Sequence, residues 1–355
     1  MDLEKIVKVE NSIEKLKDKS ARIYLLVQDT KGNPKASIKY IYDLAVVLKS
    51  NGYNPILIHE TKDYEGVSSW LDESYMELPH QAIDGQNLSI SPEDVIIIPE
   101  LYGHVMEQIK NLPCGKIVLC QAYDHMLETL APGVTWSQLG IYKCITTSET
   151  QKNYISEIMK NVSVDLIEPF IDETFSKKEK PSKPIISIHT RDQRATAKII
   201  KTFYLKYPQY RWITFRDMRG ISLTDFSKFL KESFLSVWVD AESSFGTFPL
   251  ESMASGTPVI GKVPNMLPTW MNDENGVWIN NENDMVDVVA NFVQNWLEDN
   301  ISEKLYENML STSNEFKNKS KFESSVLDLF NDIFNSRAEA FQEQLDKLNI
   351  TEQTN

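Results

Sequence analysis

Hydrophobic residues follow two patterns along the chain, and the alternation of these patterns predicts the secondary structure. Short apolar runs alternate with longer segments in which apolar residues return every three or four positions. The strand-like runs of the first half are 22–27, 55–59, 95–99, 116–121 and 143–147, and the clearest helix between them is 38–50. Strands that alternate with helices are typical of a parallel, doubly wound sheet, so we predict an α/β fold.

A second round of alternation begins at Ile185. Its predicted strands are 185–189, 211–215, 234–239, 258–261 and 275–280, and its predicted helices are 190–207, 223–232, 249–255 and 284–296. The polar, proline-bearing segment 176–184 precedes this restart and is typical of a linker. We therefore expect one domain over residues 21–175 and another over 185–300.

Both ends of the chain have helical patterns. Residues 1–20 form a predicted amphipathic helix with Ile6, Val9, Ile13 and Leu16 on one side. Residues 301–355 also have a helical pattern, which becomes polar after Arg337. We expect this tail to be a candidate for pairing subunits.

The segment 240–261 links a strand to a glycine-bearing loop, a helix and a second strand. Pro249 is favoured at the start of a helix. The free N–H groups and positive dipole end of a helix start suit a diphosphate. We place Glu251 in the first turn of this helix, where its carboxylate can accept hydrogen bonds from ribose hydroxyls. The alternative is a charge that only complements the helix dipole.

This segment resembles the donor-site signature of GT-B glycosyltransferases, especially the retaining family-4 group. The matching residues are Phe245-Gly246, Leu250-Glu251 and the run Met253-Ala-Ser-Gly-Thr-Pro-Val-Ile260. The resemblance implies two Rossmann-like, doubly wound parallel-sheet domains facing across a cleft. The first would bind the acceptor and the second the donor nucleotide. A terminal helix of such proteins commonly crosses back to the first domain.

The resemblance also implies roles for the loop before the helix. When the sequences are aligned on Phe245, the family's leading glutamate falls on Ser243, and Glu242 lies one residue earlier. Either a one-residue shift brings Glu242 to the donor sugar, or Ser243 replaces it. The backbone around Gly246, Thr247 and Phe248 would contact the donor.

Basic residues after the first strand of the second domain are candidates for binding the diphosphate. Arg191 and Arg194 follow residues 187–190, and Lys198 comes one turn later. The resemblance places an arginine and a lysine near here, although the three residues could also be solvated. No Asp-x-Asp motif occurs, so we expect no metal and a metal-independent reaction. The resemblance places Arg216, with Asp217, beside the nucleotide base.

Ligands of open α/β sheets meet the carboxyl ends of the strands. In the first domain this rule selects acidic and histidine side chains for acceptor binding or deprotonation, and the loop around Gly32 for acceptor contact. The candidates are Glu100, His104, Asp124, Lys31, Gly32 and Lys35. Any of these side chains could instead be an ordinary cap.

Composition narrows the function classes. The chain has 355 residues, 41% hydrophobic and 25% charged, with a formal net charge of −14, which is typical of a globular protein and disfavours nonspecific binding to nucleic acid. We find no long apolar run and no apolar leader, so we expect a cytoplasmic protein without a transmembrane segment. The three cysteines lack a Cys-x-x-Cys spacing and are predicted to be buried thiols.

These observations favour an enzyme that transfers a hexosyl or pentosyl group from a nucleotide-diphosphate sugar to a saccharide or lipid-linked acceptor. UDP and GDP are the favoured donor nucleotides, and we expect no further cofactor. One alternative is transfer to modified bases of phage DNA, motivated by the basic residues Lys31, Lys35 and Lys39. Another is a nucleotide-sugar-binding protein without catalysis.

Overall fold

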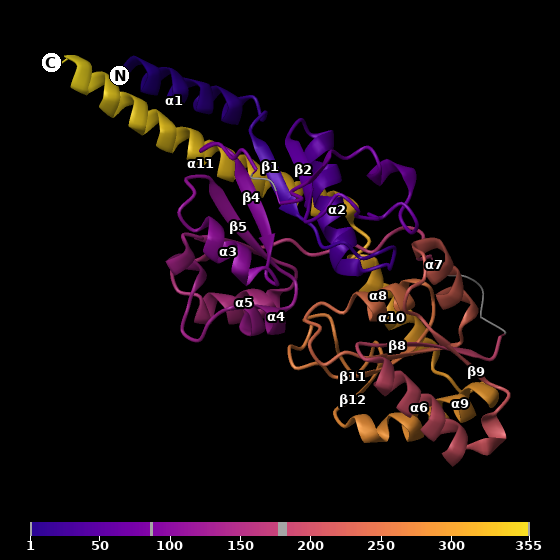
Figure 1. The fold of residues 1–355 in the computed structure, drawn as a ribbon. Coiled ribbons are helices and arrows are strands. Elements are labelled where there is room, and N and C mark those ends of the chain that lie inside the picture. Colours follow the sequence, from indigo (N-terminus) through magenta and orange to yellow (C-terminus); the bar gives the residue numbers. More distant parts are fainter. Residues whose placement is uncertain (1, 86–87, 177–182, 354–355) are drawn as a thin grey trace. The chain divides into compact units, whose positions relative to one another are not determined.

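The computed structural model describes residues 2–85, 88–176 and 183–353, and its contacts divide the chain into two compact units (Figure 1). The first unit comprises the described residues up to Thr146, together with Lys152–Ile167 and the chain from Lys321 onward. The second comprises Thr147–Gln151 and Glu168–Ser320.

The boundary between the units lies earlier than the sequence pattern suggested. Ile171 and Phe175 belong to the hydrophobic core of the second unit, and the Ile171 N–H donates to the Phe316 carbonyl. The predicted end of the first domain at residue 175 is therefore corrected to Ile167. Most of the predicted linker, 177–182, lies outside the described residues.

The first unit contains a seven-stranded sheet in the order β3-β2-β1-β4-β5-β6-β7, and all of its pairings are parallel. The strands are β1 (Arg22–Leu26), β2 (Asn54–His59), β3 (His80–Ala82), β4 (Val95–Pro99), β5 (Gly115–Cys120), β6 (Lys143–Thr146) and β7 (Ser163–Leu166). The surrounding helical segments are α1 (Asp2–Lys17), α2 (Ala36–Ser50), η1 (Glu73–Tyr75), α3 (Gly103–Ile109), α4 (Tyr123–Thr129), η2 (Trp136–Leu139), α5 (Glu149–Ile158) and α11 (Lys319–Gln353).

The second unit contains a five-stranded sheet in the order β12-β11-β10-β8-β9, again parallel throughout. The strands are β8 (Ile185–Thr190), β9 (Thr214–Asp217), β10 (Leu235–Val239), β11 (Val259–Lys262) and β12 (Val277–Ile279). The helical segments are α6 (Gln193–Lys206), η3 (Pro208–Tyr210), α7 (Leu223–Glu232), α8 (Thr247–Ala254), η4 (Glu282–Asp284), α9 (Met285–Leu297) and α10 (Glu303–Glu315).

The central strands of both sheets are buried on their two faces, which explains why β1, β4, β8 and β10 are almost continuously apolar. In the second unit, α6 and α9 cover one face around Phe203 and Val289. On the other face, α7, α8 and α10 pack around Leu230, Leu250 and Met309. The three cysteines are buried and free, as predicted.

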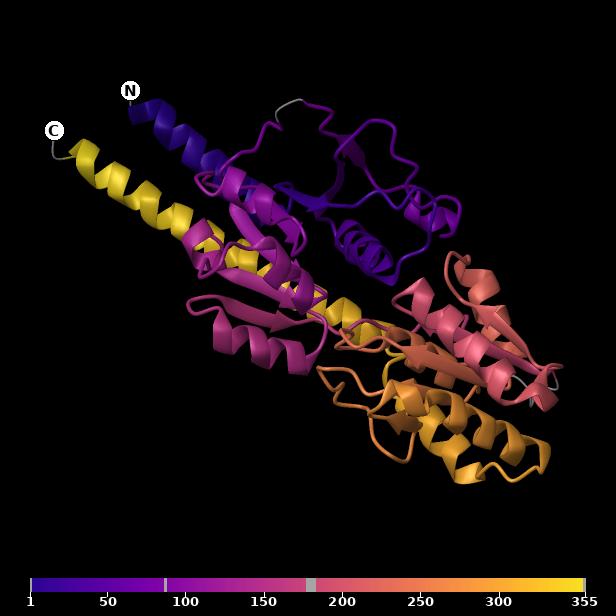
Figure 2. The ribbon, with the colours of Figure 1, turned by 60° about the horizontal axis from the view of Figure 1, so that its bottom comes forward.

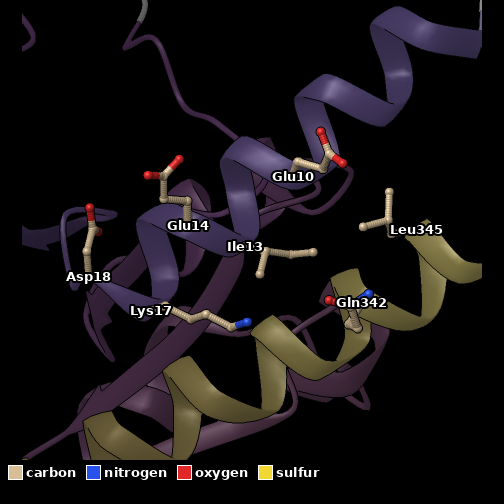
Figure 3. Close-up of a pocket in the computed structure, with 7 residues that line it drawn as sticks. All are labelled: Glu10, Ile13, Glu14, Lys17, Asp18, Gln342 and Leu345. Atoms are coloured by element: carbon tan, nitrogen blue, oxygen red, sulfur yellow. The ribbon is translucent and has the colours of Figure 1, made fainter.

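The two ends of the chain form a helical pair. Figures 1 and 2 show α1 and the last part of α11 side by side, projecting away from the first sheet. Val9, Ile13 and Leu345 form a small buried cluster between the two helices, and Figure 3 shows Ile13 and Leu345 on their facing sides. Earlier in α11, Phe330 and Phe334 pack edge-on against Tyr53, which precedes β2. Contacts therefore place α11 in the first unit.

The strand order creates one topological switch point in each sheet, where successive connections run in opposite directions. In the second sheet the switch lies between β8 and β10, because β9 lies on one side of β8 and β11 follows on the other side of β10. In the first sheet it lies between β1 and β4. Ligands of open parallel sheets bind at the carboxyl ends of strands at such points.

Candidate functional site

A pocket of about 430 Å³ lies at the switch point of the second sheet. Its walls come from the ends of β8, β10 and β11 and the starts of α6 and η4. The lining residues are Arg191, Asp192, Arg194, Ala195, Lys198, Val239, Ala241, Glu242, Lys262 and Glu282. Four residues predicted to bind the donor, namely Arg191, Arg194, Lys198 and Glu242, thus lie around one cavity.

The cations of this pocket differ in how their charge is balanced. The Arg191 guanidinium lies 3.5 Å from Asp240, and Lys198 lies 4.0 Å from Glu282. Within the described part of the chain, neither Arg194 nor Lys262 has a carboxylate at ion-pair distance. These two cations therefore provide unbalanced positive charge for an anionic ligand.

Helix α8 begins two residues earlier than predicted, which changes how its start is built. Gly246 is the N-cap residue in a left-handed conformation, with φ 78° and ψ 55°. Its N–H donates to the Ser243 hydroxyl at 3.1 Å, so this amide is already used. Thr247 and Phe248 carry the N–H groups that a helix start leaves without an intrahelical acceptor, since Pro249 has none. Of the three residues predicted to offer backbone contacts, Gly246 therefore has its N–H in use, whereas Thr247 and Phe248 stay candidates.

The acidic residue of the loop is Glu242. The Asn265 side-chain amide donates a 2.9 Å hydrogen bond to the Glu242 carboxylate. The backbone N–H of Glu242 donates to the Asp240 carboxylate. Ser243 closes the turn to Gly246, which is a local structural role. Of the two alternatives for the family's leading glutamate, the pocket wall contains Glu242 and not Ser243.

Glu251 lies on α8, half-exposed among buried neighbours. Because the helix begins at Thr247, Glu251 is in its second turn and not in the first, which corrects the sequence prediction. Helix-dipole stabilisation declines within the first turn, so the dipole is a weaker reason for a carboxylate here.

His189 is the penultimate residue of β8 and stacks on the buried ring of Phe248, with ring centroids 5.0 Å apart. Burial lowers the pKa of His189, so the imidazole is neutral near pH 7. Its Nδ1 atom is buried and has no hydrogen-bond partner among the described residues. The Phe248 side chain is therefore a packing partner of His189, which leaves only the Phe248 backbone for the predicted donor contact.

Arg216 lies away from this pocket. Its guanidinium forms a 3.0 Å ion pair with Glu232 at the end of α7 and covers the Phe229 ring at 4.0 Å. Glu232 comes just before β10, so the pair lies toward the amino edge of the sheet. The predicted contact of Arg216 with the nucleotide base is therefore not supported by its position. Asp217, at the carboxyl end of β9, is paired with Arg219, whose hydrogen bond lowers the Asp217 pKa.

Glu100 lies at the switch point of the first sheet and is only 4% exposed. Its carboxylate accepts the Ala122 N–H at 2.9 Å and lies 3.8 Å from Nδ1 of His125. Asp124 lies beside His125 in the first turn of α4, so the candidates Glu100 and Asp124 follow the neighbouring strands β4 and β5. His104 is exposed near the start of α3.

The loop after β1 contains the other predicted acceptor-side residues. Lys31 and Gly32 both have positive φ values, 49° and 71°. Lys35 donates to the Gln28 side chain at 3.1 Å. Lys39 forms an ion pair with Asp43 at 2.9 Å and is largely buried. The basic cluster is therefore smaller than the sequence suggests, because Lys39 is neutralised inside the unit.

Sequence reasoning missed two residues that line the pocket, Lys262 and Glu282, and two that contact predicted site residues, His189 and Asn265. Lys262 is the last residue of β11 and His189 is the penultimate residue of β8, so the carboxyl-end rule could have selected both. Asn265 and Glu282 come from loops and gave no local signal, since their contacts with Glu242 and Lys198 span long sequence separations.

Comparisons with known proteins identify the fold class of this chain. No protein-family model matches the sequence. An α-1,6-glucosyltransferase of Actinobacillus pleuropneumoniae is 26% identical over 196 residues, and the match spans 53% of this chain and 58% of that protein. Sucrose-phosphate synthase from Thermosynechococcus elongatus has a TM-score of 0.64 at 14% identity, over 89% of this chain and 100% of that one. The chain has the GT-B glycosyltransferase fold.

A second solved structure agrees with the GT-B fold. Anabaena HepE in complex with UDP and glucose has a TM-score of 0.63 at 12% identity, over 88% of this chain and 100% of that one. The predicted fold class, with two Rossmann-like parallel sheets, is confirmed. Over the described residues, the GT-B chain contains no helix with the length and apolar character needed to cross a bilayer. The same residues contain no cluster of three or more His, Cys, Asp or Glu side chains suited to a metal ion.

Proposed function

We propose that this chain is a glycosyltransferase that moves a sugar from a nucleotide-diphosphate donor to a saccharide or lipid-linked acceptor. The observation that carries the proposal is the pocket at the β8–β10 switch point, with the unbalanced cations Arg194 and Lys262 on its wall. The four cations of the pocket wall outnumber its three carboxylates, so a diphosphate suits the site. The relative from Actinobacillus pleuropneumoniae, a glucosyltransferase, supports the same reaction class.

We propose distinct roles for the donor-site residues. The basic group of Arg191, Arg194 and Lys198 would hold the two phosphates, together with the Thr247 and Phe248 amides. Glu251 would accept hydrogen bonds from the ribose hydroxyls. Glu242, held by Asn265, would bind a hydroxyl of the transferred sugar.

The proposed donor is a UDP-hexose. Solved structures of the GT-B neighbour HepE contain UDP or UDP-glucose, and the curated relative is a glucosyltransferase. These relatives support UDP and a hexose over the other nucleotides and sugars.

The proposed chemistry is retaining and needs no metal. The bond between the sugar C1 and the phosphate oxygen breaks, and a bond from C1 to the acceptor oxygen forms on the same face. The acceptor proton passes to the leaving phosphate oxygen, so no protein base is needed. The fixed cations would stabilise the departing diphosphate.

Transfer to a modified DNA base is the second hypothesis, and the structure weakens its motivation. Lys39 is paired with Asp43, so the loop after β1 offers fewer cations to a phosphate backbone. The assay below includes modified duplex DNA as an acceptor, and transfer to it alone would favour this hypothesis.

The test is a product assay with UDP-, GDP- and ADP-glucose, with saccharide, lipid-linked and DNA acceptors, in the presence of EDTA. We expect nucleotide release and, by NMR, a product with the donor's anomeric configuration. A charge-assisted hydrogen bond contributes about 1.5–3 kcal/mol, so Glu251→Gln should lower kcat/KM by about 10- to 150-fold.

The matched control is Glu303→Gln, because Glu303 is an exposed carboxylate near the start of α10 in the same unit. It should leave kcat/KM unchanged. Binding of a nucleotide sugar without any turnover would support the non-catalytic alternative, and an inverted anomeric centre would refute retention.

A further inference from the structure

Residues 242–246, which we call the donor loop, connect β10 to α8 and belong to neither a strand nor a helix. A segment without regular backbone pairing is mobile unless other contacts hold it. The donor loop needs a fixed shape, because Glu242 lines the pocket at one end and α8 begins directly after Gly246 at the other. The contacts that hold this loop therefore matter to the proposed donor site.

Two contacts hold the donor loop from the segment that follows β11. The Asn265 side chain donates to the Glu242 carboxylate at 2.9 Å. Nε1 of Trp270 donates to the Phe245 carbonyl at 2.7 Å. These bonds fix the loop at its first residue and near its end.

A third contact holds the middle of the loop and comes from a distant part of the chain. The Ser244 hydroxyl donates to the side-chain oxygen of Gln151 at 2.6 Å, across 93 positions of sequence. Ser244 is only 2% exposed, and Gln151 is fully buried. Because water cannot compete for such a bond, loss of either partner leaves a buried polar group to be satisfied in another way.

The backbone that carries Gln151 is itself well supported. Gln151 lies in the first turn of α5, within the segment Thr147–Gln151 of the second unit. Its N–H donates to the Ser148 hydroxyl at 3.3 Å, as at a capped helix start. The Thr150 hydroxyl donates to the Leu267 carbonyl at 2.7 Å, so a second bond ties the same turn to the second unit. The turn is therefore a fixed support for the donor loop.

We propose that Gln151 is a positioning residue of the donor site. Its bond to Ser244 holds the donor loop so that Glu242 and the start of α8 keep the spacing that a nucleotide sugar requires. The inference rests on the proposed function, in which Glu242 binds the transferred sugar and α8 the diphosphate. Gln151 acts through the loop and not by contact with the substrate. A neutral amide suits this buried place, because a carboxylate there would need a counter-charge.

The anchoring of the loop can be tested without turnover. Gln151→Met keeps the length of the side chain and removes its amide. Hydrogen-exchange mass spectrometry of the full chain should show exchange about two- to ten-fold faster in peptides that cover residues 242–248, as expected for the loss of one neutral hydrogen bond. Ser244→Ala should give a similar increase. The double variant should exchange no faster than either single variant, because both substitutions remove the same bond.

Gln294→Met is the matched control. The side-chain oxygen of Gln294 accepts the Tyr210 hydroxyl at 2.7 Å, so the same substitution removes the same kind of bond in the same unit. Gln294 lies near the end of α9, whereas the pocket lies beside η4, which precedes α9. Gln294→Met should leave exchange in residues 242–248 unchanged. This contrast separates a local effect on the donor loop from a general loss of stability.

Transfer kinetics then test whether the anchored loop serves the donor. Gln151→Met should lower kcat by about three- to ten-fold and raise KM for the nucleotide sugar, with KM for the acceptor unchanged. Gln294→Met should leave all three constants unchanged. In a Glu242→Gln background, Gln151→Met should lower kcat/KM less than in the wild type, because Glu242 is a group that Gln151 positions.

Each outcome decides one of the two proposals. Unchanged exchange in the donor loop of Gln151→Met would overturn the positioning role. So would unchanged donor kinetics, or equal losses of kcat/KM in the wild-type and Glu242→Gln backgrounds. If exchange in the loop rises but the wild type consumes no nucleotide sugar, the proposed function fails and the anchoring of the loop by Gln151 stands.

Discussion

The start of α8 gives the sharpest structural prediction, because Gly246 has two reasons to be glycine. Its backbone is left-handed, with φ 78°. A Cβ atom at this position would lie 2.7 Å from Cζ2 of Trp270. Trp270 cannot retreat freely, because its Nε1 donates a 2.7 Å hydrogen bond to the Phe245 carbonyl. Gly246→Ala should therefore strain both the backbone and the packing.

The two costs have different sizes. A left-handed alanine costs about 1–2 kcal/mol, partly offset by about 0.4–1 kcal/mol because alanine restricts the unfolded chain. Carbon atoms normally approach to about 3.5–4.0 Å, so the contact with Trp270 is a severe overlap, and overpacking of this kind costs about 1–3 kcal/mol. We expect Gly246→Ala to lower the free energy of unfolding by about 2–4 kcal/mol.

A double-mutant cycle in urea unfolding separates the two costs. Trp270→Phe removes Cζ2, so Gly246→Ala in that background should cost only the backbone part, and the coupling should be about 1–3 kcal/mol. Gly133→Ala is a second control, because Gly133 has a φ of 79° and a Cβ atom added there would meet nothing within 4 Å. Equal costs for Gly246→Ala with Trp270 or with Phe at that position would refute this reasoning.

Three further predictions concern other parts of the chain. Burial lowers the pKa of His59 from 6.5 to about 4, so the unfolded chain takes up the proton first as the pH falls. The stability that depends on the neutral ring is present above pH 6.5 and is lost toward pH 4. We expect the free energy of unfolding of the wild type to fall by about 1–2 kcal/mol between pH 7 and pH 5, after a discount for solvent screening. Urea unfolding measures this loss, and His59→Gln should not show it. Arg216→Gln should change nucleotide affinity less than about two-fold and stability by at most about 1 kcal/mol, since its ion pair with Glu232 is partly exposed; a large loss of affinity in a titration would restore its predicted role. Leu345→Ala should cost about 2 kcal/mol in thermal unfolding by opening the contact with Ile13, and an unchanged Tm would show that the α1–α11 pair adds no stability.

Much of the fold could be predicted, because buried parallel strands leave an apolar run that survives in a single sequence. The two strands that no prediction named are short and partly exposed. β3 (His80–Ala82) has only three residues, and β7 (Ser163–Leu166) has no buried position. Neither contains an apolar run, so their pairing with β2 and β6 depends on contacts that local patterns do not encode.

Site residues that follow strand ends could be predicted from the sequence. Those whose positions depend on long-range contacts could not. Arg191 and Arg194 were selected because they follow β8, and they line the pocket. Arg216 also occupies a strand, but its partner Glu232 decides which way it points. The start of α8 was misplaced because Pro249 was taken as the first helical residue, while the left-handed Gly246 allows the helix to begin at Thr247.

Calorimetric titration of UDP, GDP and ADP into the wild type, Arg194→Gln and Lys262→Gln tests the central claim most directly. The account predicts saturable one-to-one binding of at least one diphosphate to the wild type. It also predicts that each variant loses about ten-fold or more in affinity, because a charge-assisted contact to a phosphate is removed. Absence of binding by all three nucleotides, or equal affinity in the wild type and both variants, would contradict it.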